Sequence, residues 1–352
     1  MAAISLTILR TGAAAAVLAA AIAVPAFAKE QGPNIQGALD AAYAKYKDLQ
    51  EGANADYIPA LAKVDSKIYG IALVTPDGKV YTAGDVSSEV SIQSISKVFT
   101  MAKVMEDQGT EAIEKRIGVD ATGMRFNSIV SVEFAQKALG GPEINPLVNP
   151  GAITSTSMVS GASRDEIWNK ILGYYSDFAG RPLAVNQPVF KSEAETNQRN
   201  QAIAMLMYAY GHIKSEPLRA CDIYTEQCAV NVNAKDLAMM AATLANGGKN
   251  PVTGKQCMKN ANVPKVLAVM ATAGLYDDSG KWLFMTGLPG KSGVGGGVIA
   301  VSPGKFGIAV ISPPLDAAGN SVKAQKTIAE VSNMVGGNPY ASVAKSGSVA
   351  KK

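Results

Sequence analysis

Histidine is almost absent from this chain, because its 352 residues contain only His212, and cysteine occurs only three times. No spacing of these residues matches a metal site, so we expect no bound metal ion. A Ser-His-Asp triad would have to rely on His212, which follows the predicted end of a helix. A charged imidazole there stabilises the C-terminal helix dipole, and we favour this capping role over catalysis.

Charge is also sparse, since charged residues make up 18 % of the chain and the formal net charge is only +4. The lysines and arginines are scattered rather than clustered, which argues against nucleic acid or an anionic membrane as a partner. Hydrophobic residues make up 47 %, enough for a large core. We find no internal repeat, and beyond the N-terminus no apolar run approaches the length of a membrane span.

The first 28 residues have the pattern of a secretory signal peptide. Arg10 precedes an Ala-rich apolar stretch over residues 11–24, and Ala26 and Ala28 satisfy the small-x-small rule for cleavage. We therefore expect cleavage between Ala28 and Lys29 and a periplasmic or secreted protein without a membrane anchor. An uncleaved N-terminal anchor is the alternative.

Export would place the cysteines in an oxidising compartment. Cys221 and Cys228 lie seven residues apart around a predicted loop and form either a disulfide or two buried free thiols. Cys257 would be left over from that pair.

Hydrophobic periodicity predicts a β-hairpin near the N-terminus, helices in the middle and further strands near the C-terminus. The hairpin joins residues 68–74 to 80–82 around Pro76-Asp77-Gly78. The predicted helices cover residues 35–50, 94–107, 129–138, 164–179, 197–211, 234–246, 262–273 and 320–335. The late strands cover residues 283–286, 297–302 and 306–312, and residues 336–352 are predicted to be a disordered tail.

This order indicates an α/β (α+β) fold, in which one antiparallel sheet is built from N- and C-terminal strands and flanked by helices. We expect a sheet lobe from about 35–93 and 280–335, and a helical insertion lobe over about 94–279. Together they form one domain over residues 29–335, with the active site in the cleft between the lobes.

The candidate nucleophile lies in Ser94-Ile95-Ser96-Lys97. Residues three apart share one helix face, so the Lys97 amine can reach the Ser94 hydroxyl. Burial at a helix start lowers the pKa of a lysine, which allows it to accept the serine proton. Three other serines, Ser302, Ser342 and Ser348, also precede a lysine by three positions. Only Ser94 follows a strand and begins a helix, where backbone N–H groups favour an oxyanion.

A glycine-rich stretch, Lys291-Ser292-Gly293-Val294-Gly295-Gly296-Gly297, leads into a predicted strand. Its exposed N–H groups are suited to completing an oxyanion hole. A phosphate-binding loop is the alternative, but such loops lead into a helix. The two motifs together resemble those of penicillin-recognising serine enzymes, although we find no Ser-Asp-Asn between them.

Nine colinear stretches resemble the serine-dependent glutaminase family, which shares its fold with β-lactamases and penicillin-binding proteins. The resemblance covers residues 36–335. It is carried by residues 55–59, 91–98, 123–128, 145–149, 192–200, 224–228, 241–248, 274–277 and 287–297. The chain has Pro150 and Gly290 where this family usually has alanine, and the substitution at 150 bears on affinity more than on reaction type.

The resemblance implies hydrolysis of L-glutamine to L-glutamate and ammonia by an acyl-enzyme mechanism, without a metal or organic cofactor, in a homodimer or homotetramer. Ser94 is then the nucleophile, Lys97 its base, and the N–H groups of Ser94 and Val294 form the oxyanion hole. Proton relay is implied for Tyr224 and Tyr276. The implied substrate pocket comprises Tyr57, Ser94, Asn149, Glu193, Asn200, Tyr224, Tyr276 and Val294, with Glu193 pairing with the α-ammonium group and Asn149 and Asn200 holding the carboxylate.

Two other interpretations use the same residues. One is a β-lactam hydrolase or transpeptidase of the same fold, and the other is a non-catalytic periplasmic amino-acid-binding protein.

Overall fold

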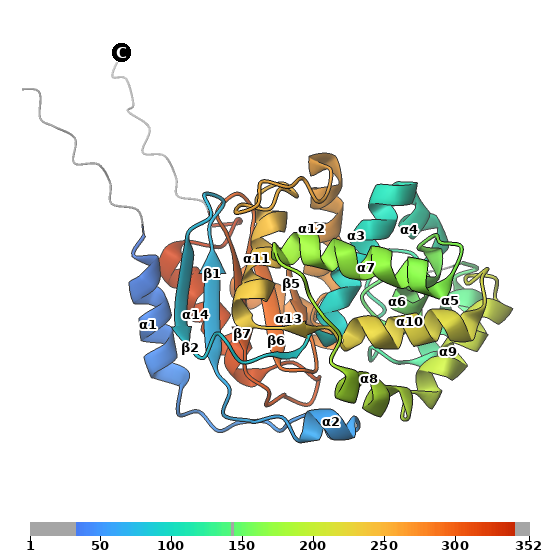
Figure 1. Ribbon diagram of the computed structural model, residues 1–352, viewed down its shortest axis with the longest axis horizontal. Helices are drawn as coiled ribbons and strands as arrows, with labels where there is room; N and C mark the ends of the chain where they lie inside the picture. The colour runs from blue at the N-terminus through green and yellow to red at the C-terminus, as the bar shows by residue number, and fades with distance from the viewer. Residues whose placement is uncertain (1–32, 142–143, 342–352) are drawn as a thin grey trace, which may run out of the picture. The chain divides into compact units, whose positions relative to one another are not determined.

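The computed structural model describes residues 33–141 and 144–341. The predicted signal peptide lies outside this range, as do residues 342–352 of the predicted tail. The described chain is built around a five-stranded antiparallel sheet of order β2-β1-β7-β6-β5 (Figure 1). The strands are β1 (Gly70–Val74), β2 (Val80–Gly84), β5 (Gly290–Ser292), β6 (Gly297–Ser302) and β7 (Phe306–Ile311). The pairing of β1 with β7 joins the two ends of the chain and confirms the predicted sheet.

The three central strands are buried on both faces, so they read as nearly continuous apolar runs. Alternate residues enter two different cores. One core includes Ala72 and Ala309 and lies against α11 (Ala234–Ala245), whereas the other includes Leu73 and Ile308 and lies against α1 (Ile35–Tyr46) and α14 (Val322–Val335). Figure 1 shows α11 on one face of the sheet and α1 and α14 on the other.

Helix α11 approaches β7 so closely that one strand position must be glycine. A Cβ atom on Gly307 would lie 2.0 Å from the backbone nitrogen of Ala242 in α11. Backbone atoms cannot move aside as side chains can, so this glycine sets the distance between helix and sheet. The contact places a helix from the middle of the sequence directly on the sheet.

The remaining helices extend the two cores of the sheet and enclose two further cores. They are α2 (Pro59–Ala62), α3 (Ser96–Gln108), α4 (Thr110–Arg116), α5 (Ile129–Ala138), α6 (Asn149–Met158), α7 (Arg164–Ala179), α8 (Gln187–Ala194), α9 (Gln198–Ala209), α10 (Pro217–Cys228), α12 (Val263–Ala273) and α13 (Ser279–Thr286). Three 3-10 turns, η1 (Gln93–Ile95), η2 (Asn260–Asn262) and η3 (Tyr276–Asp278), and a short pair of strands, β3 (Val90–Ser91) and β4 (Asn231–Val232), complete the described fold.

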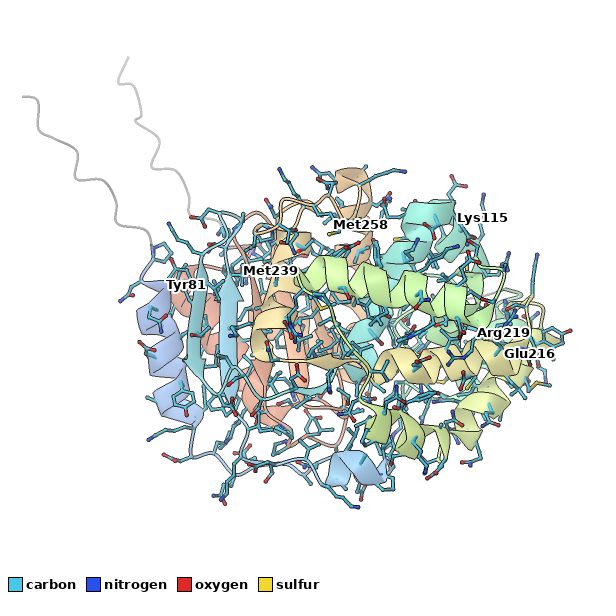
Figure 2. All side chains as sticks on the ribbon, viewed as in Figure 1. Tyr81, Lys115, Glu216, Arg219, Met239 and Met258 are labelled. Carbon is cyan, nitrogen blue, oxygen red and sulfur yellow. The ribbon has the colours of Figure 1, made fainter. Side chains whose placement is uncertain are left out.

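Side chains at the helix starts explain several of these boundaries. Asn233 and Asp236 form a reciprocal capping box at the start of α11. The Glu216 carboxylate accepts hydrogen bonds from the backbone N–H groups of Leu218 and Arg219, and Figure 2 labels Glu216 and Arg219 at this end of α10. Each cap satisfies N–H groups that the first helical turn leaves without a partner.

Two predicted elements are wrong in type. Residues 283–286, predicted as a strand, end helix α13, because Trp282 anchors this segment by donating a hydrogen bond from Nε1 to the Leu288 carbonyl at 2.7 Å. The predicted loop between Cys221 and Cys228 is helical and belongs to α10. Cys221, Cys228 and Cys257 are all buried free thiols, so the structure supports the second of the two alternatives for the first pair.

Helices α6 and α8 are absent from the predicted set. Pro150 and Pro188 each lie in the first turn of their helix, where the missing N–H has no intrahelical acceptor. Within residues 33–141 and 144–341, no helix is long and apolar enough to cross a membrane.

Candidate active site

Ser94 and Lys97 are brought together where a short strand turns into a helix. Strand β3 ends at Ser91, η1 contains Ser94, and α3 begins at Ser96. The Lys97 Nζ atom lies 2.9 Å from the Ser94 Oγ atom. Ser94 is 6 % exposed to solvent, whereas Lys97 is fully buried. The hydroxyl therefore faces the cavity and the amine lies beneath it.

The turn that presents Ser94 has an unusual backbone. Gln93 has a φ of 48°, one of three positive φ values at residues other than glycine in the described chain. Such conformations cost about 1–3 kcal/mol and are held by their surroundings. Here the glycine-rich loop supplies that support, because a Cβ on Gly295 would lie 2.3 Å from the Ser91 carbonyl oxygen.

Asn149 is the second partner of Lys97 and connects three predicted site residues. Its Oδ1 atom accepts hydrogen bonds from Lys97 Nζ at 2.7 Å and from the Tyr224 hydroxyl at 3.1 Å. Its Nδ2 atom donates to Asn200 Oδ1 at 2.9 Å. Pro150 follows it in the first turn of α6 without disturbing this arrangement. The sequence led us to expect Asn149 only as a substrate ligand, so its contact with Lys97 is an additional finding.

Burial gives Lys97 the properties of a base. Loss of solvent lowers the pKa of Lys97 to about 8, since no carboxylate makes an ion pair with it among the described residues. An amine with this pKa is partly neutral near neutral pH and can accept a proton. Its environment therefore matches the role expected from its spacing to Ser94.

Glu193 is the buried acid of the site. Burial raises the pKa of its carboxyl group to about 7, and a hydrogen bond from Gln93 acts in the opposite direction. Gln93 Nε2 donates to Glu193 Oε2 at 3.2 Å and to Ser91 Oγ at the same distance. A positively charged ligand group would favour the ionised carboxylate further.

Tyr276 lies beside Ser94 on a strained backbone with a φ of 57°. Its ring packs against the Phe126 ring with the centroids 4.8 Å apart. Burial raises the pKa of Tyr276 to about 12, while hydrogen bonds to Ser94 and Ser292 lower it. The phenol therefore keeps its proton at neutral pH.

Lys291 is a second buried lysine in this region. Its Nζ atom lies 4.0 Å from the centroid of the Tyr276 ring and donates to the Ser292 carbonyl at 2.7 Å. Burial and the neighbouring Lys97 hold the pKa of Lys291 well below its usual range. The amine has one hydrogen-bond acceptor where an ammonium ion needs three, which also favours the neutral form.

The glycine-rich loop places a backbone donor at the edge of the cavity. Val294 follows β5, and its N–H makes no hydrogen bond within the described chain. The side chain borders the cavity that Ser94 faces. This position is suited to a donor for a developing oxyanion.

These elements enclose a cavity of about 260 Å³. Seven predicted site residues line it, namely Tyr57, Ser94, Asn149, Glu193, Asn200, Tyr224 and Val294. Lys97 and Tyr276 lie just behind this lining, in contact with Ser94. The structure thus gathers all nine candidate residues in one place.

His212 lies outside this cavity. Its Nε2 atom is 3.1 Å from Gln136 Oε1, and burial together with Arg116 lowers the pKa of the imidazole. It is therefore neutral near pH 7, so the predicted capping of α9 by a charged imidazole is wrong. The described residues contain no group of three or more His, Cys, Asp or Glu side chains placed to hold a metal ion.

Three contributors to the site received no role from the sequence: Gln93, Phe126 and Lys291. Each lies within a stretch that carries the family resemblance. Its position in that stretch was the only feature of the sequence that could have pointed to a role in the site. Their function depends on contacts with Glu193 and Tyr276, which are about 100 and 15 to 150 positions away. Sequence spacing contains no information on such contacts.

Comparison with known proteins agrees with this geometry. The Glutaminase family model matches residues 52–340. A glutaminase of Colwellia psychrerythraea is 51 % identical, over 88 % of this chain and 98 % of its own length, and one of Mycobacterium ulcerans is 47 % identical, over 85 % and 92 %.

Solved structures agree as well. A solved probable glutaminase superposes with a TM-score of 0.83 at 46 % identity, over 86 % of this chain and 96 % of its own. A probable glutaminase from Bacillus subtilis, complexed with 6-diazo-5-oxo-L-norleucine, superposes with a TM-score of 0.79 at 28 % identity, over 90 % and 100 %. The chain belongs to the glutaminase family and has its β-lactamase-like fold.

Proposed function

We propose that this enzyme hydrolyses the side-chain amide of L-glutamine through a γ-glutamyl ester of Ser94. The observation that carries the proposal is the 2.9 Å contact between Ser94 Oγ and a lysine amine whose pKa burial lowers to about 8. In the neutral form, the Lys97 lone pair accepts the Ser94 proton while one N–H remains bonded to Asn149 Oδ1. Asn149 therefore orients the base.

The acylation step follows from this arrangement. Ser94 Oγ attacks the γ-carbonyl carbon, and the N–H groups of Ser94 and Val294 stabilise the oxyanion. The proton taken by Lys97 passes to the amide nitrogen, the C–N bond breaks and ammonia leaves. Tyr276 supplies a protonated hydroxyl beside Ser94, and Tyr224 fixes Asn149. Water then attacks the ester and Lys97 accepts its proton. As the ester bond breaks, this proton returns to Ser94 Oγ and L-glutamate leaves.

The other lining residues are suited to an amino acid. Glu193, buried and ionisable near pH 7, would pair with the α-ammonium group, and Asn200 with the α-carboxylate. Tyr57 stands at the mouth with about half of its surface exposed. A cavity of about 260 Å³ is large enough to hold glutamine.

Ammonia release from L-glutamine, with nitrocefin as the comparison substrate, tests the proposal. We expect ammonia from glutamine and no nitrocefin turnover, and loss of ammonia release in Ser94→Ala. Tight glutamine binding without ammonia release would instead indicate a binding protein.

Export and self-association belong to the proposal as well. The pattern of residues 1–28 supports cleavage at Ala28/Lys29 and a periplasmic or secreted enzyme, and the family resemblance supports a homodimer or homotetramer. N-terminal sequencing of exported protein and light scattering test these two points.

A further inference from the structure

A second and larger cavity adjoins the first. It has a volume of about 480 Å³ and shares four wall residues with the site cavity, namely Tyr57, Phe126, Asn127 and Val294. We call the cavity that Ser94 faces the inner pocket and this neighbour the outer pocket. Ammonia is the size of a water molecule, so release of ammonia alone requires no such space.

The groups suited to an amino acid line the inner pocket and not the outer one. Glu193, Asn149 and Asn200 line only the inner pocket, whereas Val294 borders both. A γ-glutamyl chain that begins at Glu193 and places its carbonyl carbon at Ser94 therefore has its amide nitrogen near the boundary. In a trans amide, a substituent on nitrogen points away from the acyl chain. The outer pocket, which Val294 also borders, offers space for such a substituent.

The wall of the outer pocket indicates the chemical class of such a substituent. Tyr57, Phe126 and Leu315 supply apolar surface, and the charged lining residues are Asp56, Arg125, Asp277 and Asp316. Asp316 is already bonded, since its carboxylate accepts from the N–H groups of Ala318 and Asn320 and from Gln325. No ion pair or side-chain hydrogen bond within residues 33–141 and 144–341 engages Asp56 or Asp277. Three carboxylates against one guanidinium favour a cationic group over an anionic one.

We propose that the outer pocket is a leaving-group subsite that admits N5-substituted glutamines, above all γ-glutamyl amides of diamines. This inference rests on the proposed function. Ser94 Oγ forms the ester, the C–N bond breaks, and the nitrogen leaves as a primary amine with the proton that Ser94 gave to Lys97. Water then releases L-glutamate, so the products are glutamate and the amine.

The test compares four substrates by glutamate release, which all of them share. They are L-glutamine, N5-ethyl-L-glutamine, N5-(4-aminobutyl)-L-glutamine and N5-(3-carboxypropyl)-L-glutamine. We expect the aminobutyl compound to be cleaved with a kcat/KM within about tenfold of that for glutamine. Its kcat/KM should exceed that of the carboxypropyl compound, matched in length, by about two- to fivefold, the range for exposed charge pairs.

Two variants test whether the outer pocket is responsible for cleavage of the substituted amides. Ala318 lines only the outer pocket, so Ala318→Trp should leave glutamine hydrolysis unchanged and lower kcat/KM for the substituted amides by about tenfold or more. The double substitution Asp56→Asn and Asp277→Asn should remove the preference for the aminobutyl compound and leave the ethyl compound unaffected.

The outcomes separate the two claims. An enzyme that cleaves glutamine but none of the substituted amides would overturn the subsite, as would an Ala318→Trp variant that treats all four substrates like the parent. An enzyme that releases no glutamate from glutamine itself would overturn the proposed function.

Discussion

At the residue scale, the site depends on buried polar groups whose protonation is set by their neighbours. In the proposed function Glu193 must be ionised to bind the α-ammonium group, and Gln93 is the donor that favours that form. Gln93→Leu removes this donor, so the pKa of Glu193 should rise above about 7. KM for glutamine should then increase more at pH 7 than at pH 9, whereas kcat, which follows Lys97 with its pKa of about 8, should change less.

The pH dependence of kcat and kcat/KM measures both effects. Both should rise with pH through about 7 to 8, as first Glu193 and then Lys97 lose a proton. Gln198→Leu is a matched control, because its exposed amide contacts only the Glu195 carbonyl. An unchanged KM profile in Gln93→Leu would argue against the assigned role of Glu193.

The buried amine of Lys291 lowers the free energy of unfolding. Its pKa is low in the folded protein, so below a pH of about 10 the unfolded chain binds more protons and gains stability relative to the folded one. Lys291→Met keeps the buried stem and removes the amine. We expect it to stabilise the fold at pH 7 by about 1–4 kcal/mol, with the gain disappearing above pH 10.

Activity should move in the opposite direction. Without the amine 4.0 Å from the Tyr276 ring, the phenol is less firmly placed, and kcat should fall by about tenfold or more. Thermal unfolding at pH 7 and pH 10.5, together with kcat, measures the trade-off. A variant that unfolds at lower temperature than the parent at pH 7 would show that Lys291 is structural.

At the element scale, the distance between α11 and β7 is set by one glycine. Gly307→Ala would place a Cβ 2.0 Å from the Ala242 nitrogen, and we expect it to lower the free energy of unfolding by about 1–3 kcal/mol. Gly173→Ala is the matched control, since nothing lies within 4 Å of its Cβ in the middle of α7. It should be neutral or stabilising by up to about 1 kcal/mol. Equal effects in chemical denaturation would contradict the packing described.

Helix α10 decides the state of the cysteines. Seven residues at 1.5 Å each separate Cys221 and Cys228 by about 10.5 Å along the helix, beyond the reach of a disulfide at about 7 Å. Titration of the denatured, unreduced protein should therefore find three free thiols. One thiol in place of three would mean that this helix does not form in the exported protein.

Some helices, strands and site residues could be predicted from the sequence, and others could not. Strands with both faces buried were predictable from the apolar runs in β1, β6 and β7, and Ser94 and Lys97 from one helical turn. Helix α6 was missed because proline occurs both in loops and in the first turn of a helix, where Pro150 lies. Helix α13 was missed because the hydrogen-bond partner of Trp282, the Leu288 carbonyl, lies outside the helix. Contacts such as Gln93 with Glu193, a hundred residues apart, exist only in three dimensions.

At the scale of the whole molecule, the site draws on segments from nearly the whole described chain, from Tyr57 to Val294. The fold brings together Ser94, a buried lysine whose pKa is lowered to about 8, and the glycine-rich loop at Val294. No other serine of the site has this combination, since Ser292, the nearest rival, has a fully buried hydroxyl without a hydrogen-bond partner among the described residues.

Covalent labelling tests this assignment most directly. A glutamine-like diazoketone, followed by intact mass measurement and peptide mapping, should give one adduct per chain, on Ser94. Ser94→Ala should abolish the label and lower kcat by several orders of magnitude with little change in glutamine affinity. An adduct on Ser292 or Cys257, or near-normal turnover by Ser94→Ala, would contradict the account.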